Sequence, residues 1–296
     1  MFFYVRILSY GKIHRLLFVP PLDGGLEISM EMVLLTALGV GGATVIGALL
    51  GFLFKNPSHK FSDMILSFAA GVMLAAAVLG LIAPSVDYGN ELIGKGEAPL
   101  FSWQSAVVLL MTVAGVFAGA LVLNLIDKLV PHLHKLTGTD FEDHPQKGEQ
   151  LSKVLLFVIA IAIHNLPEGI AAGVSFGTGD VGQALTVSGG IALQNIPEGM
   201  VIIAPMIATG MKKGRVFVIA LMTGVVEVIG TLIGFFAVSI STLILPFALA
   251  FAGGTMLYVI SDEMIPETHA HGNERISTYA LLAGFCVMLI FDFFLG

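Results

Sequence analysis

Eight long apolar stretches dominate this 296-residue sequence and restrict what it can fold into. Each stretch exceeds the roughly 20 residues that a helix needs to cross the ~30 Å hydrocarbon core of a bilayer. None shows the alternating pattern of about ten residues that marks a membrane β-strand. We therefore expect membrane-spanning helices at residues 30–54, 61–86, 103–130, 152–177, 182–209, 214–240, 243–266 and 276–295.

The composition supports an all-α integral membrane protein. Hydrophobic residues make up 56% of the chain and charged residues only 12%, whereas a soluble domain carries about 25% charged residues. A net charge of −7 with 14 Lys and Arg argues against a nucleic-acid partner. The single cysteine, Cys286, excludes an intrachain disulfide.

Basic residues predict the orientation. Ten of the 14 Lys and Arg residues fall in the loops after the first, third, fifth and seventh spans. The positive-inside rule makes those loops cytoplasmic and puts both termini outside a cell (inner) membrane. We divide the chain into a leader of unclear role, 1–29, and a transmembrane domain, 30–296. One cytoplasmic loop, about 131–151, carries the candidate metal-attracting histidines His132, His134 and His144.

Three carboxylates lie deep inside predicted spans. Glu168, Glu198 and Glu227 sit on three successive helices at similar depths. Each would cost roughly 2.5–3.5 kcal/mol if it were charged at the bilayer centre without a partner. No Lys or Arg lies between Lys153 and Lys212, or between Arg215 and Arg275. Protons or a bound cation must therefore balance these acids.

The first two acids belong to a repeated motif, "HNLPEG" at 164–169 and "QNIPEG" at 194–199. Helical spacing puts His164 and Asn165 on the face of Glu168, and Gln194 and Asn195 on that of Glu198. Nitrogen and oxygen ligands without thiolates suit borderline divalent ions: imidazole favours Zn²⁺, Fe²⁺, Ni²⁺ or Cu²⁺, and carboxylate and amide also accept Mn²⁺ and Cd²⁺. Amide ligands should hold such an ion weakly enough to release it.

Proline and glycine in these motifs indicate a cavity and a close helix contact. Pro167 and Pro197 each remove a backbone donor and free a carbonyl in the preceding turn, which membrane helices tolerate where they line a cavity. Gly169, Gly173 and Gly177, spaced by four, form a flat strip against which a neighbouring helix can pack.

The paired motifs resemble the signature of the ZIP metal transporters, and of their bacterial members in particular. The resemblance extends through "FAAGVMLAAAVLGLIAP" (68–84), "TGVVEVIG" (223–230) and "SDEMIPETH" (261–269). It implies a 3+2+3 inverted repeat of eight helices, with the site on spans 4 and 5. It also implies elevator-like alternating access that imports Zn²⁺, often by a homodimer. The chain would be no enzyme and would need no organic cofactor.

The resemblance also implies roles for individual residues. A first metal position would use His164, Glu168, Gln194 and Glu198, with Met73 nearby. A second would use Asn165, Asn195 and Glu227, with Glu168 and Glu198 bridging. Acids at the outer mouth would be Asp87 and Asp292. The cytoplasmic release side would hold Asp262, Glu263, Glu267, His269 and His271.

Two positions depart from the family pattern. Related bacterial members carry Asp where Asn195 stands, so the second metal position loses a charge. Asp262 stands where His is often found, which replaces an imidazole with a carboxylate at the release side.

Other functions are compatible with part of the pattern. A metal-selective channel or a cation/proton antiporter could use the same acids, and sequence does not separate these from a carrier. An intramembrane metalloprotease fits less well, because "HNLPE" lacks the paired histidines of H-E-x-x-H. Met73 is as compatible with core packing as with a soft ligand.

Overall fold

The computed structural model describes residues 29–54, 57–92, 103–129, 164–208, 210–241 and 244–295, where every regular element is helical. Seven stretches in these ranges are long and apolar enough to cross a membrane: Met30–Gly51, His59–Asn90, Ser105–Ile126, Val181–Ala208, Lys213–Ile240, Leu245–Thr268 and Glu274–Leu295. They confirm seven of the predicted spans to within four residues at each end. The eighth, 152–177, is described only as a helix over 164–175. The count of eight therefore stays a prediction, and the leader up to residue 28 and the loop 131–151 lie outside the described residues.

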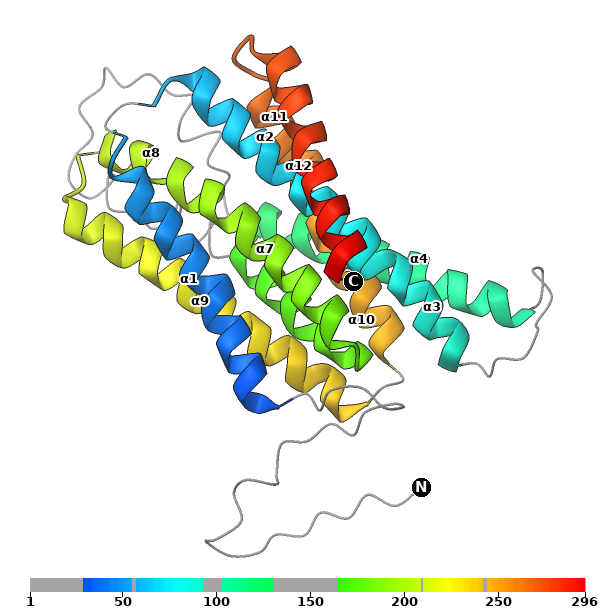
Figure 1. The fold of residues 1–296 in the computed structure, drawn as a ribbon. Coiled ribbons are helices and arrows are strands. Elements are labelled where there is room, and N and C mark those ends of the chain that lie inside the picture. The colour runs from blue at the N-terminus through cyan, green and yellow to red at the C-terminus, as the bar shows by residue number, and fades with distance from the viewer. Residues whose placement is uncertain are drawn as a thin grey trace, which may run out of the picture.

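Four helices pack into what we call the first bundle: α1 (Met30–Gly51), the helix 164–175, α7 (Val181–Val201) and α9 (Lys213–Ile240). Small residues bring their backbones together. A Cβ added to Gly41 would lie 2.3 Å from the carbonyl oxygen of Gly224, and one added to Gly47 would lie 2.2 Å from that of Ile196. In Figure 1 α1, α7 and α9 run side by side.

The glycine strip on the helix 164–175 makes the contact that its spacing predicts. A Cβ on Gly169 would lie 2.2 Å from the carbonyl oxygen of Glu227, and one on Gly173 would lie 2.0 Å from that of Thr231. Gly177 completes the strip against the side chain of Val238. The prediction of a close neighbour is confirmed, and the neighbour is α9.

The remaining long helices form the second bundle: α2 (His59–Ala75), α3 (Ala83–Leu92), α4 (Trp103–Leu129), α10 (Leu245–Val259), α11 (Ile265–Thr268) and α12 (Glu274–Leu295). Glycine again allows backbone contact within the bundle. A Cβ on Gly71 would meet the carbonyl oxygen of Leu281 at 1.9 Å, and one on Gly119 that of Phe251 at 2.2 Å. Each bundle is therefore tied together by contacts that leave no room for a side chain.

The two bundles meet along α2, α7 and α12, where most of the glycine contacts are with side chains, although a Cβ on Gly182 of α7 would lie 2.6 Å from the carbonyl oxygen of Leu295 at the end of α12. Gly80, in the π-helical segment Ala76–Ile82 that continues α2, faces the side chain of Val187 on α7, and Gly190 on α7 faces the thioether of Met288 on α12. Side chains can change rotamer more easily than a backbone can move, so this boundary is more yielding than the interior of either bundle.

Two helices of the second bundle widen into π-helical turns before a proline. The segment Ala76–Ile82 precedes Pro84, and the segment Ile260–Met264 precedes Pro266. Proline cannot donate a backbone hydrogen bond, and its ring clashes with the carbonyl four residues earlier, so a wider turn relieves the strain. The two segments occupy corresponding places in the second and seventh predicted spans, and the inverted repeat stays a prediction.

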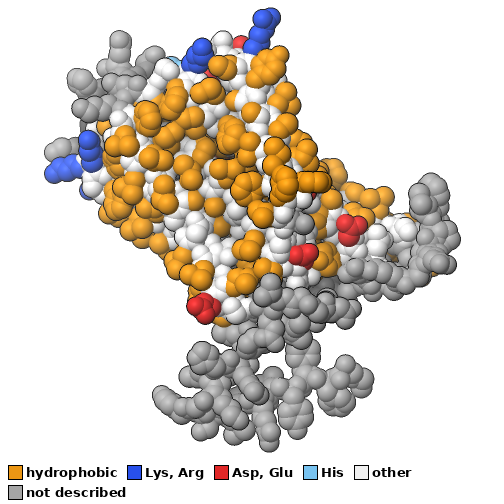
Figure 2. Space-filling model, in the orientation of Figure 1, with side chains coloured by type: hydrophobic (Ala, Val, Ile, Leu, Met, Phe, Trp, Pro, Cys, Tyr) orange, Lys and Arg blue, Asp and Glu red, His pale blue; other side chains and the backbone are white. Residues whose placement is uncertain are grey.

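The outer surface suits a lipid environment. Large apolar side chains stand exposed along α1, α4, α9 and α12, including Leu35, Phe117 and Phe293. In the face drawn in Figure 2, hydrophobic side chains form a broad band, Lys and Arg lie at its upper and left edges, and acidic side chains stand out lower down. This separation of charge agrees with the predicted spans.

Candidate metal site between the two motifs

Glu227 lies at the centre of a buried hydrogen-bond network in the first bundle. Its carboxylate accepts from the Thr44 hydroxyl at 2.6 Å and from the Asn195 amide at 2.6 Å, and also from the Asn165 amide. The side chain is 0% exposed. α1, the helix 164–175 and α7 thus each supply a donor to an acid on α9, which confirms that both motifs lie beside Glu227.

The three predicted acids come together in one electrostatic group. Glu168 is 2% exposed and is repelled by both Glu198 and Glu227. Glu198 is half-buried, and it is attracted by His164 and repelled by Glu263. No Lys or Arg side chain forms a salt bridge with any of the three in the described parts of the chain. Like charges at this depth need protons or a cation between them.

Several buried polar atoms around this group make no hydrogen bond. They are Oε2 of Glu168, both amide atoms of Gln194 and Oδ1 of Asn195. A buried polar atom without a partner costs roughly 1–3 kcal/mol, so native proteins keep few of them. All four belong to residues that the motifs predict as metal ligands, and oxygen atoms of this kind can coordinate a divalent ion.

His164 is engaged across the boundary between the bundles. Its Nε2 lies 2.8 Å from both carboxylate oxygens of Glu263, in the π-helical turn that follows α10. The Glu227 network, by contrast, lies within the first bundle, and the bond from Asn124 to Tyr258 lies within the second. The first motif therefore carries a side chain that contacts the opposite bundle.

The observed arrangement does not itself enclose an ion. Among the described residues, no three His, Cys, Asp or Glu side chains converge as a metal-binding group. The contacts give the reason: His164 is turned to Glu263, and Glu227 is held by Thr44, Asn165 and Asn195. In this arrangement Nε2 of His164 is engaged by Glu263.

Met73 lies buried on α2 opposite the second motif. α2 and α7 are antiparallel, because Gly80 faces Val187 and a Cβ on Gly190 would lie 3.6 Å from Ala76. Continuing that register brings Met73 to the level of Gln194. Met73 also belongs to the main hydrophobic core, so its role as a ligand stays a prediction.

The predicted release-side residues separate into different roles. Glu263 contacts the first motif through His164. His269 bonds within the turn, to the carbonyl of Ile265 and the hydroxyl of Thr278. His271 lies 3.0 Å from the Asp63 carboxylate, whereas Asp262 and Glu267 are exposed on the same end.

The outer acids and the loop histidines stay untested as site residues. Asp87 is exposed on α3 and Asp292 is half-buried near the end of α12. Among the described residues no hydrogen bond joins either acid to the motif group. His132, His134 and His144 lie outside the described residues.

Sequence reasoning missed two residues that support the arrangement. Thr44 binds Glu227, and its signal is its place on the glycine-lined face of α1, between Gly41 and Gly47. Asp63, buried near the start of α2, accepts from Asn273 at 2.9 Å and pairs with His271. No local sequence pattern predicts the contacts of Asp63, because His271 and Asn273 lie more than 200 positions away from it along the chain.

Comparison with known proteins finds relatives that cover most of the chain. The family described as "ZIP Zinc transporter" matches residues 134–292. "Zinc transporter GufA" of Myxococcus xanthus is 40% identical over 263 residues, which cover 89% of this chain and 98% of that protein. "Zinc transporter ZIPB" of Bordetella bronchiseptica is 36% identical over 254 residues, 86% of this chain and 78% of that protein. "Zinc transporter ZupT" of Streptococcus mutans is 31% identical over 264 residues, 87% of this chain and 94% of that protein. By its motifs, its helices and these relatives, the chain belongs to the ZIP family of metal transporters.

Proposed function

We propose that this protein is a carrier that brings Zn²⁺ into the cytoplasm through a site built from its two repeated motifs. The observation that carries the proposal is a group of three acids on three helices, Glu168 and Glu227 buried and Glu198 half-buried, to which no Lys or Arg forms a salt bridge in the described parts of the chain. A divalent cation is the charge that this group needs. The relatives named zinc transporters support Zn²⁺ as that cation.

The donors suggest two adjoining metal positions. The first combines an imidazole, an amide and carboxylates, from His164, Gln194, Glu168 and Glu198, with Met73 on the facing helix. The second combines the amides of Asn165 and Asn195 with Glu227. Because Asn195 now donates to Glu227, the second position is the weaker of the two, and we expect transport to rely on the first.

The division into bundles supports an elevator-like movement. Backbone contacts through glycine hold α1, the helix 164–175, α7 and α9 together, so these helices can move as one body. Side chains dominate their boundary with α2 and α12. Moving the first bundle along that boundary would carry both motifs from one side of the membrane to the other.

The contact between His164 and Glu263 would mark the release end of that movement. Glu263 competes with the metal for the same imidazole nitrogen, at 2.8 Å. An ion that loses His164 to Glu263 loses its one nitrogen ligand, which weakens its hold. The clustering of Lys and Arg at the predicted cytoplasmic loops supports release toward the cytoplasm.

The remaining expectations of the family resemblance are part of the same proposal. The protein would lie in the inner membrane as a homodimer with both termini outside. Fe²⁺, Mn²⁺ and Cd²⁺ are further candidate substrates, because their preferred ligands overlap with this donor set.

Uptake into vesicles that contain the purified protein tests the proposal. We expect Zn²⁺ uptake that saturates at micromolar concentrations, and that Glu168→Ala or His164→Ala abolishes. Glu31→Gln, an exposed acid at the start of α1, is the matched control and should transport normally. Normal uptake by Glu168→Ala would refute the site, and single-channel currents would replace the carrier with a channel.

A further inference from the structure

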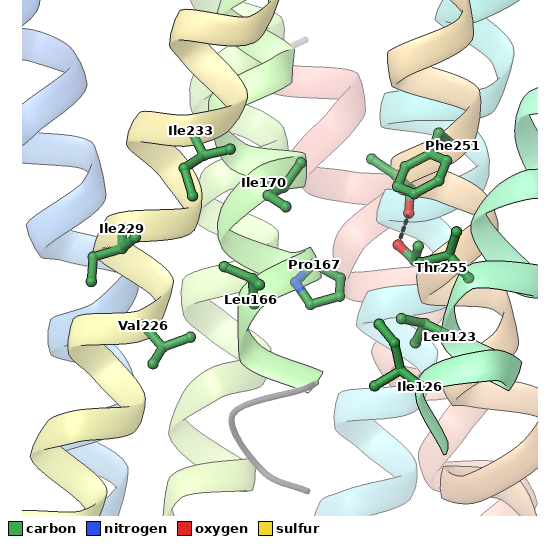
Figure 3. A pocket seen from close by; sticks show the side chains of 12 residues that line it. Leu123, Ile126, Leu166, Pro167, Ile170, Val226, Ile229, Ile233, Phe251 and Thr255 are labelled. Atoms are coloured by element: carbon green, nitrogen blue, oxygen red, sulfur yellow. Dashed lines mark hydrogen bonds between the residues drawn. The ribbon is translucent and has the colours of Figure 1, made fainter. Parts of the chain in front are cut away.

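An apolar groove lies on the side of the first motif that faces away from α1. Its cavity has a volume of about 540 Å³, within the usual range of ligand pockets. The helix 164–175 and α9 form one wall, and α4 and α10 form the other. Figure 3 shows side chains from both walls turned toward the space between them.

The lining offers nothing to a polar ligand. Eleven of its twelve residues are apolar: Val122, Leu123, Ile126, Leu166, Pro167, Ile170, Val226, Ile229, Ile233, Phe251 and Ala252. The twelfth is Thr255, whose hydroxyl already donates to the carbonyl of Ala252 at 2.7 Å. A buried water needs two to four polar partners, so hydrocarbon suits this groove better than water does.

The groove opens toward lipid. Val122 on α4 and Ile229 and Ile233 on α9 line it and are also 39%, 49% and 49% exposed. They are continuous with the exposed apolar surface of two membrane-spanning helices, Ser105–Ile126 and Lys213–Ile240. What reaches the mouth of the groove is therefore the acyl region of the bilayer.

We propose that this groove binds the acyl chain of a membrane lipid, inserted between the two bundles beside the metal site. The chain would touch Pro167 next to Glu168 on one wall, and Phe251 and Thr255 on the other. The acyl chain would make dispersion contacts with the side chains that line the groove, which those side chains lack when the space is unfilled. This part of the inference rests on the proposed movement of the bundles. During that movement the two walls of the groove would shift relative to each other, and the acyl chain could leave and another could enter.

A tryptophan reporter and lipids brominated along their acyl chains test the binding directly, because bromine quenches indole fluorescence on contact. The single native tryptophan, Trp103, is first changed to Phe. Phe251→Trp then places the reporter in the groove. Phe247→Trp, 38% exposed on the same helix, gives the quenching of ordinary lipid contact, and Phe176→Trp, 0% exposed, gives the baseline.

We expect the groove reporter to be quenched nearly as strongly as the Phe247 reporter. Adding Val122→Phe and Ile229→Phe, which narrow the mouth from both walls, should remove that quenching and leave the Phe247 reporter unaffected. The proposal is overturned if the Phe251→Trp reporter is quenched no more than the Phe176→Trp reporter. It is also overturned if quenching of the Phe251→Trp reporter persists after Val122→Phe and Ile229→Phe are added. If the Phe251→Trp reporter is quenched only as weakly as the Phe176→Trp reporter, and the variant with Val122→Phe and Ile229→Phe no longer forms dimers, then a second copy of the chain occupies the groove instead of a lipid. The readout does not depend on metal uptake, so failure of the proposed transport would be seen separately.

Discussion

Replacing Asn195 by Asp would introduce a charge at a position where the family resemblance leads us to expect one. Asn195 now donates to Oε2 of Glu227 at 2.6 Å, in a position that is fully buried. In Asn195→Asp a second carboxylate would stand in place of that donor. Two charges ~4 Å apart repel by about 4 kcal/mol at the effective dielectric constant of ~20 that suits protein sites.

We therefore expect metal-free Asn195→Asp to unfold at a lower temperature than the unsubstituted protein, by roughly 8–16 °C if each kcal/mol shifts the midpoint by about 2–4 °C. Zn²⁺ should restore much of this loss, because a cation between the carboxylates turns repulsion into coordination. An ion present at about 100 times its dissociation constant adds about 2.7 kcal/mol. Thermal unfolding with and without Zn²⁺, and a metal count on the purified protein, measure both effects.

Asn195→Leu is the matched control for this prediction. It removes the same hydrogen bond from Glu227 and keeps a similar side-chain size, but it adds no charge. It should be destabilised, and Zn²⁺ should raise its unfolding temperature no more than it raises that of the unsubstituted protein, because the first metal position is intact in both. If Asn195→Asp unfolds like the unsubstituted protein without metal, or retains no more zinc, the second metal position is not where we place it.

Three further predictions concern the packing, the release contact and the soft ligand. Gly173→Ala places a Cβ 2.0 Å from the carbonyl oxygen of Thr231 and should destabilise the protein by about 1–3 kcal/mol in thermal unfolding. Gly42→Ala, which meets nothing within 4 Å, should be neutral or slightly stabilising, and equal effects would contradict the packing argument. Glu263→Ala removes the competitor for the imidazole, so kinetic uptake assays should show a lower KM and a lower maximal rate; an unchanged maximal rate would argue against a release role. Met73→Leu should leave stability nearly unchanged but reduce the preference for Cd²⁺ over Zn²⁺ in competition uptake, and an unchanged preference would make Met73 a core residue only.

The helices were predictable because lipid imposes a simple rule on sequence. A spanning segment must be long, apolar and internally hydrogen-bonded, and seven of the expected segments appear within four residues of their predicted ends. The glycine strip Gly169–Gly173 was equally readable, since its spacing describes one helix face. The sequence did not indicate that the strip packs against α9, because the backbone of any of several neighbouring helices could have made this contact.

The sequence indicated which buried polar side chains come together around Glu227 but did not indicate their contacts. Acids in apolar segments that contain no Lys or Arg are easy to recognise in a sequence, and so are the amides beside them. The bond from Thr44 to Glu227 joins residues 183 positions apart, and the pair His164–Glu263 joins residues 99 apart. Such contacts depend on how bundles are arranged in space, which hydropathy and helical spacing do not specify.

X-ray absorption at the zinc edge of the zinc-loaded protein tests most directly whether the paired motifs hold the metal. The account predicts nitrogen and oxygen ligands at about 2.0–2.2 Å, with the scattering pattern of one imidazole. That pattern should disappear in His164→Ala and persist in His271→Ala. Imidazole scattering that survives His164→Ala would place the zinc on other histidines and contradict the account.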